Sequence, residues 1–449
     1  MTPTTNIREW PFRLRPPQIL AIGFALVIAL GTTLLALPVA SETGQPVSIV
    51  DALFTATSAT CVTGLNTVDT PTTFSLFGEI VIVLLIQTGG LGFLTLSTMV
   101  ALLLGKRITL KERLLMQEAL NQLTVEGVVR LTKYVLTFTF ICEGLGALLL
   151  GLRFSRDMPL GQAFYFGIFH AVSAFCNAGF SLFSANLMDY RGDLLVNLVI
   201  TTLIILGGLG FSVVADIYTK RSWQRLSLHS KVVLTTTFWL IVLGTILFMA
   251  LEYTNPLSLA PLPLNEKLLA SYFQAVTPRT AGFNTLNIGA LRPVTLFLLI
   301  ILMFIGASPG STGGGIKTST FTTIAVAVWS IIQGKYDIEI FGRRLPRGMV
   351  LKALAVAAVS MMLVVTVTGV LLITEQKEME IVLFETVSAF GTVGLSAGLT
   401  PQLTVAGKLL ITATMYSGRV GPLTLAFAIA QRLGRQGIKH YPEEGVIIG

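Results

Sequence analysis

Apolar stretches of two lengths alternate along this chain. Four pairs of long stretches, most of them at or above the roughly 20 residues of a bilayer-spanning helix, each enclose a shorter segment. The long helices are expected at 18–38 and 74–104, 127–152 and 194–219, 231–254 and 293–332, and 348–374 and 403–431. The short segments are at 48–60, 161–175, 265–278 and 380–390. They have too few residues to cross, so each is predicted to enter the bilayer, turn and return.

The pattern predicts an all-α multi-spanning membrane protein. Four repeats of membrane helix, pore helix and membrane helix would surround a central pore, giving eight transmembrane helices and four re-entrant pore loops. Because each repeat must pack on its neighbours to bury its polar loop, the four form one integral pore domain. The expected boundaries are an N-terminal segment at 1–17, repeat 1 at 18–104, repeat 2 with its preceding loop at 105–219, repeat 3 at 220–332, repeat 4 at 333–431 and a tail at 432–449.

The composition agrees with a membrane protein and indicates its orientation. Only 12% of the residues are charged and 53% are hydrophobic, whereas soluble proteins carry about 25% charged residues. The net charge of +8 does not indicate nucleic-acid binding, because 21 of the 31 Lys and Arg residues fall on alternate connections. The positive-inside rule places those connections and both termini in the cytoplasm of a cell-membrane protein. Acidic residues gather on the opposite side, where they either concentrate cations or only reflect topology.

A short phrase with a glycine recurs once in each repeat, directly after the short segment. The copies are CVTGL at 61–65, CNAGF at 176–180, RTAGF at 279–283 and GTVGL at 391–395. Because glycine has no Cβ, its carbonyl can face a shared axis, where a ring of carbonyls replaces the water around a cation. The alternative is that these glycines only permit tight helix packing. The predicted filter residues are Val62, Thr63, Gly64, Asn177, Ala178, Gly179, Thr280, Ala281, Gly282, Thr392, Val393 and Gly394.

The second long stretch of repeat 3 has an interior that cannot stay helical in lipid. Residues 306–315 contain five glycines and Pro309. A nucleotide-binding P-loop is a poor match, because an extra residue separates Gly315 from Lys317 and no strand precedes them. We therefore expect an unwound loop below the filter that moves to open the pore. The predicted gate residues are Gly306, Ser308, Gly310, Ser311, Thr312, Gly313, Gly314, Gly315, Lys317 and Arg419.

Several charged residues lie in apolar surroundings. Arg419 is expected to contact carbonyls of the glycine-rich loop and hold the gate shut, with packing as the alternative, since an unpaired charge inside a bilayer is costly. Lys317 is expected to snorkel to the cytoplasm, with a gate role as the alternative. Arg279 should turn away from the axis and brace the filter from behind, with a pore-helix acid as its candidate partner. His170 and Glu385, each nine residues before a filter glycine, are expected to form structural hydrogen bonds.

The remaining polar groups do not indicate catalysis. Three histidines are far apart in the sequence, and no nucleophile lies at catalytic spacing from a base. The three cysteines have no metal-binding spacing. Asp51 and Glu143 are expected to be paired or to cap helices. We therefore expect no enzyme activity and no organic cofactor.

Four segments resemble the Trk/Ktr/HKT superfamily of potassium transporters. They are FHAVSAFCNAGFSLF at 169–183, TPRTAGFN at 277–284, GASPGSTGGGIKT at 306–318 and SAFGTVGL at 388–395. The resemblance covers nearly the whole chain and is greatest to the KtrB-type membrane subunit of bacterial Ktr systems. It implies four membrane–pore–membrane units with one filter glycine each, K+ uptake past an intramembrane gating loop, a homodimer, and a cytosolic nucleotide-binding regulatory ring of the KtrA type.

The resemblance also bears on selectivity and coupling. Gly64 favours K+, since relatives with serine at this position prefer Na+, and Cys176 stands where relatives often have Asn. The basic segments 105–133, 220–231 and 335–352 are candidate docking surfaces for the ring, or only topology charge. Two modes of transport stay open. One is a gated K+ pathway with Na+ as a candidate activator, and the other is a symporter that couples K+ to Na+ or H+.

Overall fold

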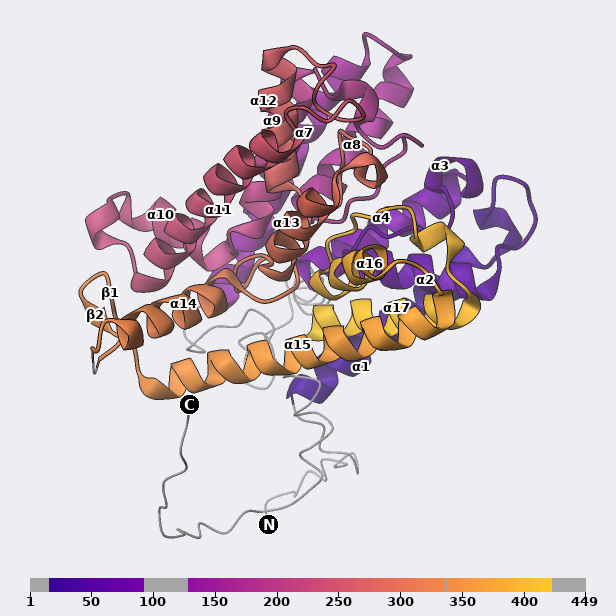
Figure 1. Ribbon diagram of the computed structural model, residues 1–449. Helices are drawn as coiled ribbons and strands as arrows, with labels where there is room; N and C mark the ends of the chain where they lie inside the picture. Colours follow the sequence, from indigo (N-terminus) through magenta and orange to yellow (C-terminus); the bar gives the residue numbers. More distant parts are fainter. Residues whose placement is uncertain (1–15, 93–127, 336, 422–449) are drawn as a thin grey trace, which may run out of the picture.

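The protein is described by a computed structural model over residues 16–92, 128–335 and 337–421. Repeat 1 contains α1 (Pro16–Leu35), α2 (Ile49–Thr60), α3 (Thr70–Thr73) and α4 (Leu76–Leu91). Repeat 2 contains α7 (Val128–Phe154), α8 (Leu160–Phe175), α9 (Leu194–Gly208) and α10 (Phe211–Lys220). Repeat 3 contains α11 (Leu228–Glu252), α12 (Leu264–Val276), α13 (Pro293–Phe304) and α14 (Thr318–Ile332). Repeat 4 contains α15 (Arg347–Glu375), α16 (Met379–Gly391) and α17 (Val405–Val420), and the fold class predicted from the sequence is confirmed (Figure 1).

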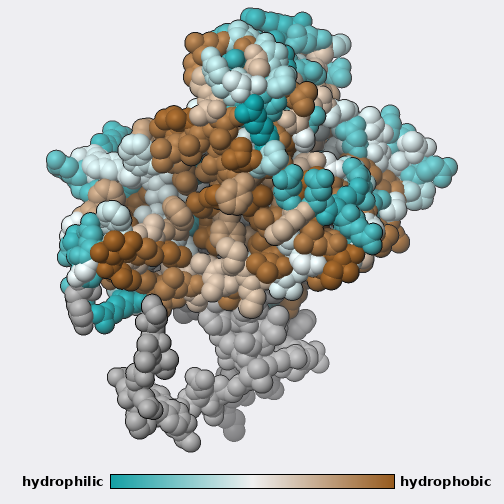
Figure 2. All heavy atoms as spheres, in the orientation of Figure 1, coloured by the Kyte–Doolittle hydropathy of each residue, from teal (hydrophilic) through white to brown (hydrophobic). Residues whose placement is uncertain are grey.

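The first helix of every repeat is long and apolar enough to cross a bilayer. Within the described ranges, the helices that meet this requirement are Gln18–Leu35, Val129–Phe154, Leu228–Glu252 and Arg347–Glu375. Large apolar side chains face outward from them, such as Leu26 on α1 and Met362 on α15, both 65% exposed. Figure 2 shows apolar residues across the middle of this face and hydrophilic residues at its edges. Apolar surface of this extent suits contact with lipid rather than water.

The four short segments form pore helices, as the sequence predicts. α2, α8, α12 and α16 agree with the expected ranges to within two residues. The Ser48 side chain caps α2 by accepting a hydrogen bond from the Asp51 backbone N–H (3.2 Å). Each pore helix ends at its glycine phrase, or three residues before it in repeat 3, and most of its residues are buried. The pore helices therefore point their C-terminal ends at the glycine phrases.

The second helices depart from the prediction. A break was expected only in repeat 3, but the second helices of the other repeats are also interrupted. The expected helix at 194–219 is two helices, α9 and α10, that are bent by 94°. The bend lies at Gly210, whose φ is 91°. α4 ends before Gly92 (φ 79°) and α17 ends before Gly421 (φ 93°) at the matching places, so the predicted continuous helices at 74–104 and 403–431 are wrong at these points. Left-handed backbone is open to glycine and ends a helix.

Several sequence predictions fall outside the described residues. They concern nearly all of the N-terminal segment 1–17, the loop 105–127 with the adjoining part of the helix at 74–104, and the end of the helix at 403–431 with the tail 432–449. These stay predictions.

Glycines just before these breaks bring the second helices close to the pore helices. A Cβ on Gly89, Gly207 or Gly418 would clash with the carbonyl oxygen of Thr60, Phe175 or Phe390, respectively, each at the end of the pore helix in the same repeat. Gly210 lies against the broken segment of repeat 3, since a Cβ there would be 2.5 Å from the Pro309 carbonyl oxygen. In repeat 2, Gly207 therefore permits close helix packing, and Gly210 leaves room for the loop.

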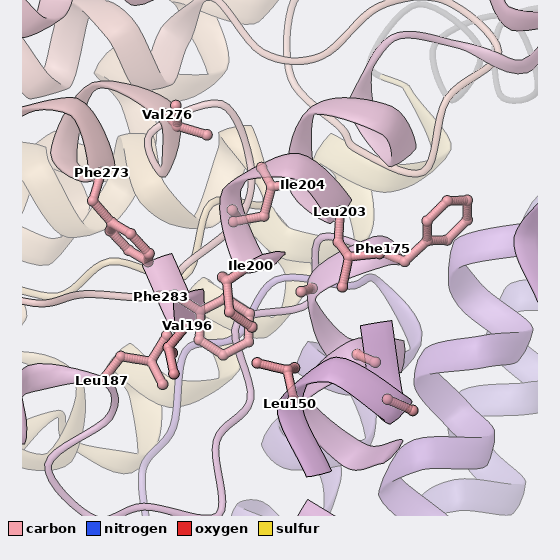
Figure 3. Close-up of a cluster of buried hydrophobic side chains, with 14 of the residues drawn as sticks. Leu150, Phe175, Leu187, Val196, Ile200, Leu203, Ile204, Phe273, Val276 and Phe283 are labelled. Atoms are coloured by element: carbon pink, nitrogen blue, oxygen red, sulfur yellow. The ribbon is translucent and has the colours of Figure 1, made fainter. Parts of the chain in front are cut away.

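Apolar clusters join neighbouring repeats into a ring. Figure 3 shows one of them, in which Phe273 and Val276 of α12 lie in the same core as Ile200 and Ile204 of α9. A second cluster joins α13 to α16, and a third joins repeat 1 to repeat 4. At this last seam Lys408 of α17 forms a 2.7 Å ion pair with Asp51 of α2, as expected for a paired acid. The first and last repeats thus close the ring without a covalent connection.

A small hairpin departs from the otherwise helical structure. β1 (Glu339–Ile340) pairs antiparallel with β2 (Arg343–Arg344) between α14 and α15. Its tip residue Phe341 contacts Trp223, which precedes α11, with 6.4 Å between the ring centroids. Two of the basic segments noted in the sequence, 220–231 and 335–352, therefore meet on one side of the molecule.

Candidate ion pathway

The four glycines of the repeated phrase lie around a common centre. Each position where a Cβ would stand faces the carbonyl oxygen of the residue before the next repeat's glycine. The pairs are Gly64 with Ala178 (2.5 Å), Gly179 with Ala281 (2.8 Å), Gly282 with Val393 (2.7 Å), and Gly394 with Thr63, which closes the circle. A side chain at any of the four would push into a neighbouring strand. The repeats therefore converge here, although the glycines are more than 100 residues apart in sequence.

The backbone of the four strands follows one unusual pattern. The residue two before each glycine is left-handed, with φ of 58° at Val62, 60° at Asn177, 73° at Thr280 and 49° at Thr392. The glycines are also left-handed, with φ of 69–94°, and the residue between has ordinary negative φ. Alternation of this kind turns successive peptide groups the same way, so that their carbonyls can lie on one side of the strand, as a ring of coordinating carbonyls requires. For β-branched residues it costs about 1–3 kcal/mol each, so the surrounding packing must hold these strands in place.

Hydroxyl groups at the end of each pore helix hold the strands. The Ser58 hydroxyl accepts a hydrogen bond from Gly64 N–H (3.0 Å), and the Ser388 hydroxyl accepts one from Gly394 N–H (3.1 Å). In the other two repeats the hydroxyl donates to a carbonyl just after the glycine, from Ser173 to Phe180 (2.8 Å) and from Thr277 to Phe283 (2.5 Å). These clamps were not predicted from the sequence. Their signal is a Ser or Thr three residues before each five-residue phrase, or two before it in repeat 3.

The broken segment of repeat 3 lies against the inner end of these strands. Gly313 touches the Thr280 hydroxyl and Gly314 touches the Thr392 hydroxyl, closely enough that a Cβ on either glycine would clash. The segment is held by backbone hydrogen bonds to the break in repeat 2, from Ser308 to Gly208 (3.0 Å) and from Thr312 to Gly207 (3.2 Å). This loop therefore reaches from repeat 2 to repeat 4. Its free backbone groups make these contacts because it is unwound, whereas the backbone groups of a helix would be paired within the helix.

Arg419 ties the loop to two other repeats. Its guanidinium donates to the carbonyl of Thr312 in the loop and to the carbonyls of Gly89 and Gly90 at the end of α4. The expected contact with loop carbonyls is therefore present. The sequence did not reveal the second contact, with repeat 1, which makes Arg419 a bridge across the centre of the molecule.

Lys317 does not extend to the cytoplasm as expected. Its amine turns back and donates to the carbonyls of Gly313 (2.7 Å) and Gly314 (3.3 Å). The prediction of snorkelling is wrong because these carbonyls have lost their helical partners in the unwound loop, and an ammonium group satisfies them at short range.

Three other polar residues support the strands from behind. Arg279 is 3% exposed and donates to Thr237 of α11 (3.3 Å), so it braces the glycine phrase from behind as expected, although its partner is not a pore-helix acid. His170 contacts Ser181 (3.0 Å) and Glu385 accepts from Ser396 (3.0 Å). Both contacts join a pore helix to the segment after its glycine. The expected structural hydrogen bonds of these two residues are present.

The closed ring of strands, the pore helices and the loop beneath them lie at the centre of the molecule. A comparison of the sequence with known families identifies the class of protein. Residues 4–439 match the TrkH family of cation transport proteins. The chain belongs to this family, whose members are transporters and not enzymes, so the expectation of a non-enzymatic membrane protein is confirmed.

The chain has full-length relatives. It is 48% identical to the Ktr system potassium uptake protein B of Bacillus subtilis over 99% of both chains. It is 40% identical to the protein of the same name in Vibrio alginolyticus, over 96% of this chain and 95% of that one. It is also 40% identical to the potassium/sodium uptake protein NtpJ of Enterococcus hirae, over 97% and 98%.

A solved structure shows the same fold. The potassium transporter TrkH from Vibrio parahaemolyticus superposes with a TM-score of 0.69 at 17% identity, covering 95% of this chain and 88% of that one. The family match and the full-length relatives confirm the resemblance predicted from the four segments.

Proposed function

We propose that this protein is the ion-translocating membrane subunit of a Ktr-type potassium uptake system. The observation that carries the proposal is the closed ring of four glycine strands, because a cation stripped of water needs oxygens on several sides. The names of the full-length relatives point to potassium as the transported ion. The overall similarity extends over the whole chain, so the proposal does not depend on the glycine phrases alone.

The proposed filter consists of the carbonyl oxygens of three residues in each strand. The ion would exchange its hydration shell for these carbonyls, and the pore helices would direct the negative ends of their dipoles at it. Two hydroxyls on these strands, Thr63 Oγ1 and Thr392 Oγ1, are buried and have no hydrogen-bond partner among the described residues. These hydroxyl oxygens lie on the filter strands and would be additional oxygen donors beside the proposed ion path. The alternative of glycines that serve only helix packing does not explain why Val62, Thr280 and Thr392 are strained.

The proposed gate is the loop 306–315 together with Arg419 and Lys317. The loop touches two filter strands from below, and Arg419 holds it to repeat 1. In this closed state the guanidinium also repels cations. Opening would require the loop to leave Thr280 and Thr392, with loss of the Arg419 contacts. Glycines at 313 and 314 suit such a movement, because they place little side-chain volume in the path.

The proposed assembly is a homodimer that binds a cytosolic, nucleotide-binding regulatory ring. The Ktr names of the relatives describe a system of more than one component. Both termini would lie in the cytoplasm, on the side of the basic segments. The docking surface for the ring would include the hairpin β1–β2 and the segment around Trp223, where exposed aromatic and basic residues lie together.

A coupled mechanism is the second candidate, because the relative from Enterococcus hirae is named for potassium and sodium. The two mechanisms differ in how flux responds to the sodium gradient. Proteoliposomes with a fixed K+ gradient separate them. A channel-like pathway gives a reversal potential set by K+ alone, with Na+ acting at most as an activator, whereas a symporter gives a reversal potential that moves with the Na+ or H+ gradient.

Growth rescue tests the main proposal. A strain without potassium uptake should grow on low potassium when it expresses this chain with a regulatory partner, and less well with the chain alone. The Gly282→Ser variant is the control, since it alters one filter strand. Failure of the native protein to restore growth or K+ uptake, despite normal amounts in the membrane, would contradict the proposal.

A further inference from the structure

Glu143 is a buried acid in a membrane-spanning helix that the proposed filter and gate do not use. It lies near the middle of α7 and is only 6% exposed. Among the described residues it forms no ion pair with a lysine or arginine. A carboxyl group inside a bilayer is costly to keep, so such a residue suggests a function by default.

The Glu143 carboxyl joins two repeats. One oxygen, Oε2, accepts a hydrogen bond from Nε2 of Gln87 on α4 (3.2 Å), and the other, Oε1, lies 3.8 Å from Sγ of Cys176. The same thiol is 3.6 Å from Oε1 of Gln87. Since a thiol has a single proton, Cys176 donates to one of these oxygens at a time. The three side chains therefore form a small closed network at the seam between repeats 1 and 2.

This network lies directly behind the second filter strand. Cys176 is completely buried and precedes Asn177, the left-handed residue with which the strand begins. On the other side Cys176 is pressed against α4, since a Cβ on Gly90 would be 2.6 Å from its sulfur. The strand cannot shift at this point without moving Glu143, Gln87 or α4.

Within the part of the chain that the structure describes, no such network is present at the matching position of the other repeats. Cys61 occupies it in repeat 1, Arg279 in repeat 3 and Gly391 in repeat 4. Arg279 contacts a threonine, Gly391 has no side chain, and no hydrogen bond from the Cys61 thiol to an acid is present in the described structure. Glu385 also lies behind a strand, in repeat 4, but it binds the segment after the glycine. Among the described residues, an acid in contact with the first residue of a glycine phrase is therefore particular to repeat 2.

We propose that Glu143 is a positioning residue for ion selectivity, acting through Cys176 and Gln87 on the second filter strand. The inference depends on the proposed function, since it assumes that the ring of strands selects the ion. By accepting hydrogen bonds from two repeats, the carboxyl fixes the distance between α4 and the strand. That distance sets where the carbonyls of Asn177 and Ala178 lie in the ring, and therefore how well the ring fits K+ rather than Na+.

The test compares variants of the full chain in proteoliposomes with its regulatory partner. The measured quantities are the KM for K+, the maximal flux and the K+/Na+ selectivity ratio, each normalised to the amount of folded protein. Glu143→Ala and Cys176→Ala remove parts of the network, whereas Glu143→Gln and Cys176→Ser keep hydrogen-bonding groups in place. Thr139→Val is the matched control, because Thr139 is one turn earlier on the same face of α7, fully buried, and without a hydrogen-bond partner among the described residues.

We expect Glu143→Ala to lower the K+/Na+ ratio and raise the KM by about three- to tenfold, the effect of one or two lost hydrogen bonds. Cys176→Ala should have a smaller effect in the same direction, and Glu143→Gln, Cys176→Ser and Thr139→Val should stay near the wild type. If Glu143→Ala yields too little folded protein, the K+/Na+ ratio and the KM of Cys176→Ala test the proposal instead.

Gly282→Ser separates failure of this inference from failure of the proposed function. If Gly282→Ser changes selectivity while Glu143→Ala and Cys176→Ala leave both selectivity and KM unchanged, the positioning role is excluded and the filter stands. If Gly282→Ser also leaves selectivity unchanged, the ring is not the filter and the inference fails with it. A loss of maximal flux alone, at constant KM and selectivity, would mean that the network is only structural.

Discussion

The ring of strands proposed as the filter and the loop beneath it differ in how they use the four repeats. In the ring, all four repeats contribute the same element, with the same alternation of backbone conformation and a hydroxyl clamp from each pore helix. In the loop, repeat 3 contributes the whole unwound segment and repeat 4 contributes Arg419. A binding site for a spherical ion benefits from equal oxygens on all sides. A gate needs one element that can move while the others stay in place.

The difference has a counterpart in the contacts. The hydroxyl clamps hold each proposed filter strand to the pore helix of its own repeat, and the strands also pack against one another around the ring. The loop is held across repeats, by the backbone of Gly207 and Gly208 and by the guanidinium of Arg419. We expect these contacts to keep the strands in place, whereas the position of the loop depends on how repeats 1, 2, 3 and 4 lie relative to one another. A partner that moves one repeat could therefore release the loop without disturbing the ring.

The largest effect is expected from a side chain in the ring. Gly282→Ser places a Cβ 2.7 Å from the Val393 carbonyl oxygen in a left-handed residue (φ 74°). Strain of about 1–3 kcal/mol should reduce K+ affinity or K+/Na+ selectivity by about tenfold to a hundredfold. Competitive ⁸⁶Rb+ uptake against Na+ measures it. Gly398→Ala is the control, since it also has positive φ (96°) but open space around its Cβ position; an equal effect in both would mean that crowding of the ring is irrelevant.

A smaller effect, in the opposite direction for flux, is expected at the gate. Arg419→Ala removes the hydrogen bonds to Thr312, Gly89 and Gly90, and deletion of 310–314 removes the loop itself. Loss of one charged hydrogen bond is worth about 1.5 kcal/mol at the lower end, so basal K+ flux without the partner should rise by about tenfold. Arg419→Lys keeps the charge but loses the planar set of guanidinium donors, so its basal flux should lie between those of the wild type and Arg419→Ala. Unaltered or lower flux in both Arg419→Ala and the deletion would exclude the gate assignment.

The smallest effect is expected at the hydroxyl clamps. Ser388→Ala and Ser58→Ala each leave one glycine N–H without its side-chain acceptor. A loss of about 0.5–1.5 kcal/mol should lower selectivity by roughly two- to tenfold and leave the gate unaffected. Ser388→Thr should restore the hydrogen bond. If the alanine variants raised basal flux without changing selectivity, the assignment of selectivity to the ring and of closure to the loop would be contradicted.

The local pattern of the sequence was sufficient for several features. The four pore helices, the four glycines, the unwinding of 306–315 and the contact of Arg419 with that segment all follow from hydrophobic period, segment length and the properties of glycine, proline and a buried charge. These are properties of short stretches of chain. They could be predicted because a bilayer leaves a helix or a protected loop as the only options for the backbone.

Other features were decided only by the tertiary structure, because they depend on contacts between distant repeats. The left-handed conformation of Val62, Asn177, Thr280 and Thr392 is imposed by packing around the ring, against the local preference of these residues. Lys317 turns back because the loop presents unpaired carbonyls, and Arg279 binds Thr237 because α11 lies behind it. Arg419 reaches Gly89, which is 330 residues away in sequence. Sequence alone determined which segments enter the membrane, and packing determined which atoms meet there.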